Sequence, residues 1–285
     1  MGIDAATARL LHSARQRGVS FRQTATFGVQ DWHVSDREHR RLVDEFGAPP
    51  GPVATGADFL RLLGAEAVDA VDVSDYEGAT VLHDLNEPLG DEHKGRYTAV
   101  VDGGTLEHVF NVTVGLRNAM ELVAEGGHLL LCNPANNLLG HGFYQFSPEL
   151  HFRALSAENG YRVERVVLVE EGGGWYDVAD PAEVRARVQV TNDRPTYLFT
   201  QARRVEAVVP FGAWPQQSDY RAIWDDHAGA RDARRSPAAF AVRQRLRAVG
   251  PLWRLLRRLK GAAQAPGERR RRSFENRRHF RPVDR

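Results

Sequence analysis

The segment from residue 96 to residue 150 constrains the fold more than any other part of the chain. Two apolar runs, 97–102 and 128–133, are bounded by glycine or proline and predict buried strands. Between them, the apolar residues of 112–124 are spaced like one face of a helix. A strand, a helix and a strand in this order form a βαβ unit, so we predict a parallel sheet. Ligands bind beyond the carboxyl ends of such strands, where the polar residues of this segment gather.

The alternation of strands and helices continues through most of the chain. The segment 172–195 is rich in glycine and then helical, which indicates a lid or an insertion. The predicted helices are 4–17, 36–46, 55–63 and 147–159, and the other predicted strands are 22–27, 68–73, 80–83, 161–170 and 197–208.

Two motifs carry a family resemblance. Leu106-Glu107-His108-Val109 follows the 97–102 strand, and Gly126-Gly127 precedes the next strand. Together they resemble the second half of class I S-adenosylmethionine-dependent methyltransferases, over roughly residues 20–205. The resemblance implies an α/β fold with a Rossmann-like, doubly wound sheet that is mostly parallel and has an antiparallel last strand. We therefore predict a methyltransferase-like domain in 1–230, followed in 231–285 by a basic amphipathic helix and a disordered Arg-rich tail.

The resemblance also implies S-adenosylmethionine as the cofactor and places its contacts at strand ends. Family members carry a glycine-rich loop after the first strand, but the corresponding segment 24–30 has one glycine only. An acid after the second strand can accept both hydroxyls of a ribose, and Asp72 has that place, with Asp75 and Glu77 as alternatives. The departure in the first loop leaves open that the cofactor has been lost. The predicted cofactor-binding residues are Gly28, Gln30, Asp72, Asp84, Leu85, Asn86, Asp102 and Gly103.

The loop 140–147, which follows the 128–133 strand, is the predicted catalytic segment. His141 stands between two glycines, and the ordinary pKa of histidine suits proton transfer. Tyr144 would orient the substrate, and His108 is a further candidate base. The structural alternative is an ordered loop whose aromatic residues fill the core while a backbone carbonyl binds His141. The predicted catalytic residues are thus His141, Tyr144 and His108.

Metal and disulfide chemistry find little support in the sequence. The histidines contain no His-x-x-x-His or His-Glu-x-x-His pair, so we predict no metal. The single cysteine, Cys132, excludes an internal disulfide, and its place in a predicted strand indicates a core residue.

The charge of the chain is strongly asymmetric. Residues 231–285 hold 18 Lys or Arg and four acids, so the rest of the chain is acidic. The basic tail can balance the acidic body, or lie on a partner subunit or an anionic membrane. Nucleic acid is the least supported partner, because the tail contains no known binding module. The apolar face predicted for 238–260 favours packing on the body or on a second subunit, in a homo- or hetero-oligomer, over peripheral membrane contact.

These observations favour a cytoplasmic enzyme that acts on a small molecule. No apolar run reaches the length of a transmembrane helix, and the first residues predict an amphipathic helix instead of a signal peptide. The leading hypothesis is a small-molecule methyltransferase that uses S-adenosylmethionine in specialised-metabolite or glycan biosynthesis. The alternatives are a cofactor-independent enzyme on the same fold, catalysing an intramolecular displacement or elimination, and a non-catalytic subunit of a homologous enzyme complex.

Overall fold

The computed structural model describes residues 2–221, 270 and 272–283, which belong to two compact units. The first unit consists of Met1–Val178, Asp193–Pro215 and Pro282–Arg285, and the second of Ala179–Asn192 and Gln216–Arg281. The amphipathic helix predicted within 238–260 lies outside the described residues. The described end of the chain contains a short strand, β11 (Phe280–Pro282), where the sequence predicted disorder.

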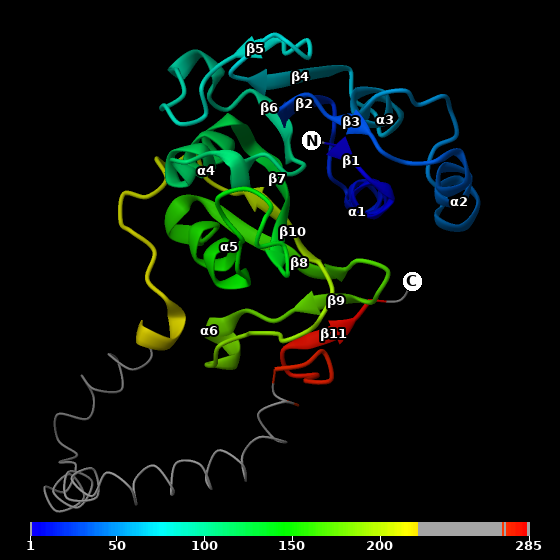
Figure 1. The fold of residues 1–285 in the computed structure, drawn as a ribbon. Coiled ribbons are helices and arrows are strands. Elements are labelled where there is room, and N and C mark those ends of the chain that lie inside the picture. Colours follow the sequence, from blue (N-terminus) through cyan, green and yellow to red (C-terminus); the bar gives the residue numbers. More distant parts are fainter. Residues whose placement is uncertain (1, 222–269, 271, 284–285) are drawn as a thin grey trace, which may run out of the picture. The chain divides into compact units, whose positions relative to one another are not determined.

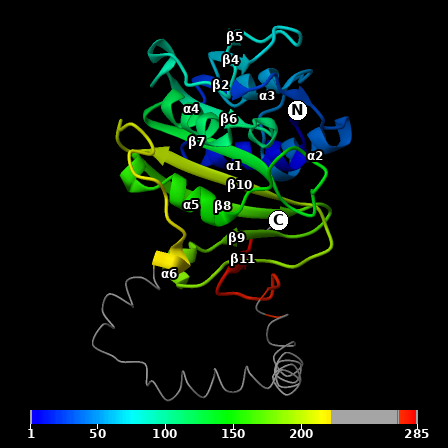
Figure 2. The ribbon, with the colours of Figure 1, turned by 60° about the vertical axis from the view of Figure 1, so that its left-hand side comes forward.

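Eight strands of the first unit form one sheet in the order β9-β8-β10-β7-β6-β2-β4-β5 (Figures 1 and 2). Strands β5, β4, β2, β6 and β7 are parallel, whereas β10 runs antiparallel to both of its neighbours, β7 and β8. This arrangement confirms the prediction of a mostly parallel sheet with an antiparallel last strand. The strands are β2 (Gln23–Phe27), β4 (Ala67–Asp72), β5 (Val81–Leu82), β6 (Tyr97–Asp102), β7 (Val123–Asn136), β8 (Tyr161–Glu170), β9 (Trp175–Val178) and β10 (Thr196–Arg204).

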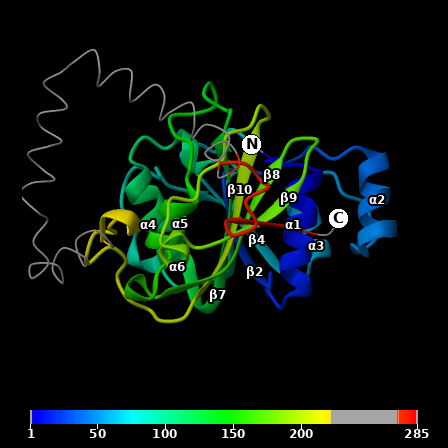
Figure 3. The ribbon, with the colours of Figure 1, turned by 90° about the horizontal axis from the view of Figure 1, so that it is seen from below.

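Helices cover both faces of this sheet, as the prediction of a doubly wound fold requires. Figure 3 shows α1 (Ala5–Gln16), α2 (Asp36–Phe46) and α3 (Gly56–Leu62) on one face. Helices α4 (Val112–Leu122) and α5 (Pro148–Ala154) lie on the other face. No helix in the described part of the chain combines the length and the apolar character needed to cross a membrane.

The helix starts follow from local sequence. Ser35 and Glu38 form a reciprocal capping box at the start of α2, and Thr55 and Asp58 do the same for α3. Ser147 accepts a hydrogen bond from the backbone N–H of Leu150 and so caps α5.

Three predicted boundaries were wrong by several residues, and the first is that of strand β7, which begins at Val123 instead of residue 128. Helix α5 ends at Ala154, and a separate 3-10 helix, η3 (Ala157–Asn159), covers the rest of the predicted 147–159 helix. Strand β10 ends at Arg204 instead of residue 208. The segment 172–195 contributes strand β9 to the first unit, and a short helix, α6 (Pro181–Val184), to the second.

The N-terminal residues lie close to the first loop of the sheet. Strand β1 (Gly2–Ile3) pairs in parallel with β3 (Asp31–Trp32), which follows that loop directly. The Ile3 side chain is fully buried, in the same core as Leu10 and Leu11 of α1 and Phe59 of α3. This pairing fixes Asp4 and the start of α1 beside the carboxyl ends of the strands, where the sequence predicted a site.

Candidate active site

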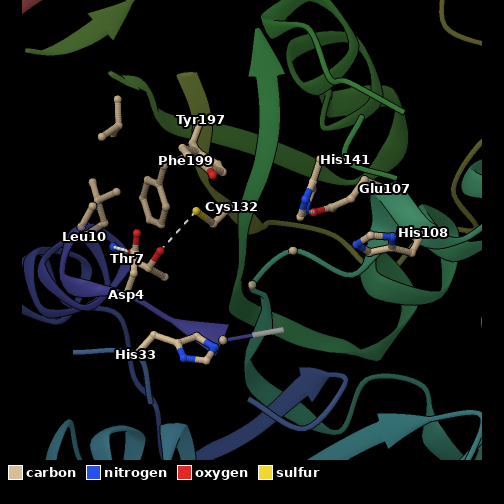
Figure 4. A pocket seen from close by; sticks show the side chains of 15 residues that line it. Asp4, Thr7, Leu10, His33, Glu107, His108, Cys132, His141, Tyr197 and Phe199 are labelled. Atoms are coloured by element: carbon tan, nitrogen blue, oxygen red, sulfur yellow. Dashed lines mark hydrogen bonds and ion pairs between the residues drawn. The ribbon is translucent and has the colours of Figure 1, made fainter. Parts of the chain in front are cut away.

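A cavity of about 360 Å³ lies at the carboxyl edge of the sheet. Figure 4 shows Glu107, His108 and His141 together on one side of it. The opposite side is formed by residues of α1 and of the adjoining strands, among them Thr7 and Phe199. The cavity thus combines one strongly polar wall with a partly apolar one.

The polar wall begins with two buried carboxyl groups. Asp102 ends β6 and is inaccessible to solvent, and its Oδ1 accepts hydrogen bonds from the backbone N–H groups of Thr105 (2.8 Å) and Leu106 (3.3 Å). These bonds fix the start of a 3-10 helix, η2 (Leu106–His108), which carries Glu107. Asn133 of the neighbouring strand β7 donates its Nδ2 to Asp102 Oδ2 (2.6 Å) and to Glu107 Oε2 (3.2 Å). One amide therefore links two acids.

Burial makes the charged forms of these acids unfavourable. It raises the pKa of Asp102 above its ordinary value. Burial, followed by the negative charge of Asp102, raises the pKa of Glu107 to about 8. The pair therefore retains a proton near neutral pH, as two close carboxyl groups in a dry environment do. Glu107 is the member of the pair that lines the cavity.

The loop after β7 brings His141 to Glu107. The backbone N–H groups of Phe143 (2.7 Å) and Tyr144 (3.3 Å) both donate to the carbonyl oxygen of Glu107. Gly142 has a positive φ of 74°, and a Cβ at this position would lie 2.7 Å from the same carbonyl oxygen, so the close approach requires glycine. As a result, His141 Nε2 lies 3.5 Å from Glu107 Oε1, with half of the histidine side chain exposed and the carboxylate 1% exposed.

The structure separates the predicted catalytic residues into two groups. His108 and His141 both line the cavity, with ring centroids 5.1 Å apart. Burial, followed by the proximity of His141, lowers the pKa of His108. Tyr144 is not among the residues that line this cavity, and its hydroxyl donates to the carbonyl oxygen of Phe110 (2.7 Å).

The polar wall also has the donor types of a metal site. One ligand atom each from Glu107, His108 and His141 lies within 4.8 Å of the other two. The absence of a metal stays a prediction, since a carboxylate and two imidazoles are common ligands of transition metals.

Sequence reasoning missed several residues of this cavity. Glu107, Asp4 and Tyr197, which line the cavity, are not among the predicted site residues, and neither is Asn133, which donates to Glu107. The sequence contains one usable signal, because Asp102 and Asn133 occupy the ends of adjacent predicted strands. Cys132 also lines the cavity, but burial raises the pKa of its thiol to about 12, which opposes a role as nucleophile.

The predicted nucleoside-binding residues lie elsewhere at the carboxyl edge. Asp72 ends β4, is half-buried, and accepts a hydrogen bond from the backbone N–H of Ser74 (3.3 Å). Asp84 accepts two hydrogen bonds from Asn86, and the Asn86 side chain accepts one from the backbone N–H of Asn111 (2.8 Å). Neither these residues nor the buried Leu85 line the cavity.

The first loop does not fit the methionine part of S-adenosylmethionine in this structure. Gly28 is buried, and the chain continues into β3 instead of a helix whose N–H groups could face a ligand. The Gln30 side chain is 4% exposed and donates to the carbonyl oxygen of Phe27 (2.7 Å). A Cβ at Gly103 would meet the Oε1 atom of Gln30, so this glycine leaves room for Gln30. The two predicted cofactor residues thus contact each other.

Comparisons with known proteins found similarity in structure only. Neither a protein-family model nor a curated protein sequence matches the chain. An S-adenosylmethionine-dependent methyltransferase from Mesorhizobium loti aligns at 15% identity with a TM-score of 0.39, over 67% of this chain and 96% of its own. A branched-chain polyamine synthase from Thermus thermophilus aligns at 12% identity with a TM-score of 0.38, over 75% of this chain and 61% of its own.

The strand order identifies the fold independently of these alignments. From β5 to β8 the sheet reads β5-β4-β2-β6-β7-β10-β8, and β10 alone runs opposite to the other strands of this series. The predicted family has this topology, with seven strands and the last one reversed between its neighbours. The protein has a class I methyltransferase-like α/β fold.

Proposed function

We propose that the protein is an enzyme that activates a small molecule in the cavity by moving a proton between the substrate and the Glu107–His141 pair. The observation that carries this proposal is the 3.5 Å contact between Nε2 of the half-exposed His141 side chain and Oε1 of the buried Glu107. A buried carboxyl group with a raised pKa is suited to hold or release a proton near neutral pH.

The two side chains would have different tasks. His141 lines the cavity and would exchange the proton with the substrate at Nδ1, the ring nitrogen that does not contact Glu107. Glu107 would orient the ring and stabilise the imidazolium that forms, while Asn133 keeps the carboxyl group in place. When His141 removes a proton from an oxygen or nitrogen of the substrate, that atom can act as the nucleophile of a displacement. When His141 instead gives a proton to a leaving group, the leaving group can depart in an elimination. This corresponds to the cofactor-independent alternative that the sequence left open.

Methyl transfer from S-adenosylmethionine is a second candidate, favoured by the positions of Asp72 and Asn86 at strand ends. Both lie where the family resemblance places contacts to the nucleoside. The proton transfer proposed for Glu107 and His141 does not require this cofactor. The Gln30 side chain occupies the space against Gly103, where the family resemblance places part of the cofactor.

Mass spectrometry of reaction mixtures tests the proposed activity. The full chain is incubated with a panel of small amines and alcohols, with and without S-adenosylmethionine. We expect conversion by the wild type, and loss of conversion in His141→Gln. The control is His93→Gln, which alters a histidine that lines neither this cavity nor its neighbour and should remain active. Equal activity of both variants would refute the role of His141, and no conversion of any compound would favour the non-catalytic subunit.

Calorimetry with S-adenosylhomocysteine decides about the second candidate. Binding in the micromolar range that weakens about 10- to 150-fold in Asp72→Ala would support methyl transfer, since this is the cost of losing charged hydrogen bonds. We expect Gln30→Ala to bind this ligand more tightly than the wild type, because the smaller side chain frees space above Gly103. No heat with the wild type and no heat with Gln30→Ala would support the cofactor-independent enzyme.

A further inference from the structure

The active-site cavity adjoins a second one. The second cavity has a volume of about 420 Å³ and is lined by residues of α1, α2, the β8–β9 turn and β10. Five residues line both cavities: Asp4, Ala6, His33, Val169 and Tyr197. The two cavities therefore adjoin along one groove, and we call the five shared residues, together with Glu171 near Tyr197, the junction.

Negative charge predominates along this groove. Among the described residues that line the first cavity there is no lysine or arginine, whereas Asp4 is an acid and Glu107 belongs to the carboxyl pair that retains a proton near neutral pH. The second cavity adds Glu38, Glu170 and Glu171. The two cationic residues of the second cavity, Arg9 and Arg41, do not line the first one, and both contact other side chains of the protein. The Arg41 Nε atom lies 2.6 Å from Glu45, and the Arg9 guanidinium lies 3.9 Å from the ring centroid of Phe46 and 4.4 Å from that of Trp175.

The pKa of Tyr197 reflects the negative charges near the junction. Tyr197 lies in β10, where it pairs with Pro134 of β7 and Val169 of β8, and its side chain is half-buried. Burial raises the pKa of Tyr197, and the negative charges of Glu171 and Asp4 raise it further. The hydroxyl group therefore remains protonated and can donate or accept a hydrogen bond.

We propose that this groove binds a small molecule that carries a protonated amine, and that the ammonium group is held at the junction by Asp4, Glu171 and Tyr197. The apolar part of such a molecule would lie against Leu10, Val169 and Phe199. The inference rests on the proposed function. Binding of the ammonium group at the junction would position another group of the same molecule at the Glu107–His141 pair. A carboxylate would meet like charges there, and a neutral polyol would gain no charge interaction.

Three probes of equal chain length test the charge preference. They are 5-amino-1-pentanol, 1,5-pentanediol and 5-hydroxypentanoate, which differ mainly in a positive, neutral or negative end group. Binding to the full chain is measured by ligand-observed NMR near neutral pH. We expect the amino alcohol to bind at least about tenfold more tightly than the other two, and to lose affinity as salt is added.

Conservative variants locate the anchor. Asp4→Asn keeps an oxygen that can cap α1 while it removes the charge, and Glu171→Gln does the same at the β8–β9 turn. Each should weaken binding of the amino alcohol about three- to tenfold and leave the diol unaffected. Glu66→Gln is the control, because this exposed acid precedes β4 at the opposite edge of the sheet.

The outcomes separate this inference from the proposed function. Equal affinity for the amino alcohol and the diol, or equal loss in the Glu66→Gln control, would overturn the ammonium anchor even if conversion still depends on His141. Selective amine binding that survives in His141→Gln, combined with unchanged conversion in that variant, would support the anchor and refute the proton transfer.

Discussion

Glu107→Gln should lower turnover about 10²- to 10⁴-fold and at the same time stabilise the protein above neutral pH. The carboxyl group is 1% exposed and close to Asp102, and its pKa in the folded protein is raised to about 8. A raised pKa means that the folded state holds a proton that the unfolded state has released. The stability from this group is therefore complete below the unfolded pKa of about 4.3, and it is lost as the pH rises through the folded pKa.

The glutamine variant avoids this loss, because it stays neutral at every pH. We expect a gain of about 2–5 kcal/mol in the free energy of unfolding on the alkaline side, measured by denaturant titration between about pH 5 and pH 9. The histidines with lowered pKa values titrate below about pH 6.5, so the alkaline side reports on the acids. Glu66→Gln should show no such gain. If Glu107→Gln loses stability at every pH, favourable interactions of the Glu107 carboxylate offset the cost of its burial. That result would contradict the raised pKa on which the proposed site depends.

Asn133→Asp should destabilise the protein by about 3–5 kcal/mol near pH 8, because it leaves three acids in contact and removes the amide that links two of them. Asn133 is inaccessible to solvent, and its Nδ2 atom donates to both Asp102 (2.6 Å) and Glu107 (3.2 Å). The substitution conserves shape, so packing alone predicts almost no effect. Near pH 5 the carboxyl groups can hold protons, and the loss should be much smaller.

The double variant Asn133→Asp/Glu107→Gln is the matched control. It moves the amide to the neighbouring position and restores a donor between the remaining acids, so it should recover most of the lost stability. Thermal or denaturant unfolding at both pH values measures these effects. A loss that is independent of pH, or that the second substitution does not reduce, would show that the shape of the site matters more than its charge.

Much of the fold was predictable from the sequence because each element carries its own signals. The alternation of apolar strands with amphipathic helices predicts the parallel sheet, and Ser35 and Ser147 indicate helix starts by their capping ability. The early end of α5 at Ala154 was not predictable from these local signals, since the apolar spacing continues beyond it. Strand β9 was missed because a strand of four residues has too short a pattern.

The candidate site was predictable only where a reactive side chain stands next to glycines that mark a loop after a strand. His141 lies between glycines after a strand, so its approach to a strand end could be expected. The depth of Glu107 could not, because it depends on Asn133 from a different strand and on the loop that closes over the η2 carbonyl. The contact of Gln30 with Gly103 is likewise non-local. The roles predicted for Asp72, Asp84 and Asn86 stay predictions.

The position of β10 has a consequence for synthesis of the chain. This strand is late in the sequence but lies between β7 and β8, with Phe199 paired to both Cys132 and Val167. While the ribosome is still making the segment before Thr196, β7 has a long unpaired edge that is rich in apolar residues. Such an edge is a template for pairing with another nascent chain. Fragments that end before β10 should therefore collect in inclusion bodies, whereas chains that include Arg204 can close the sheet and fold.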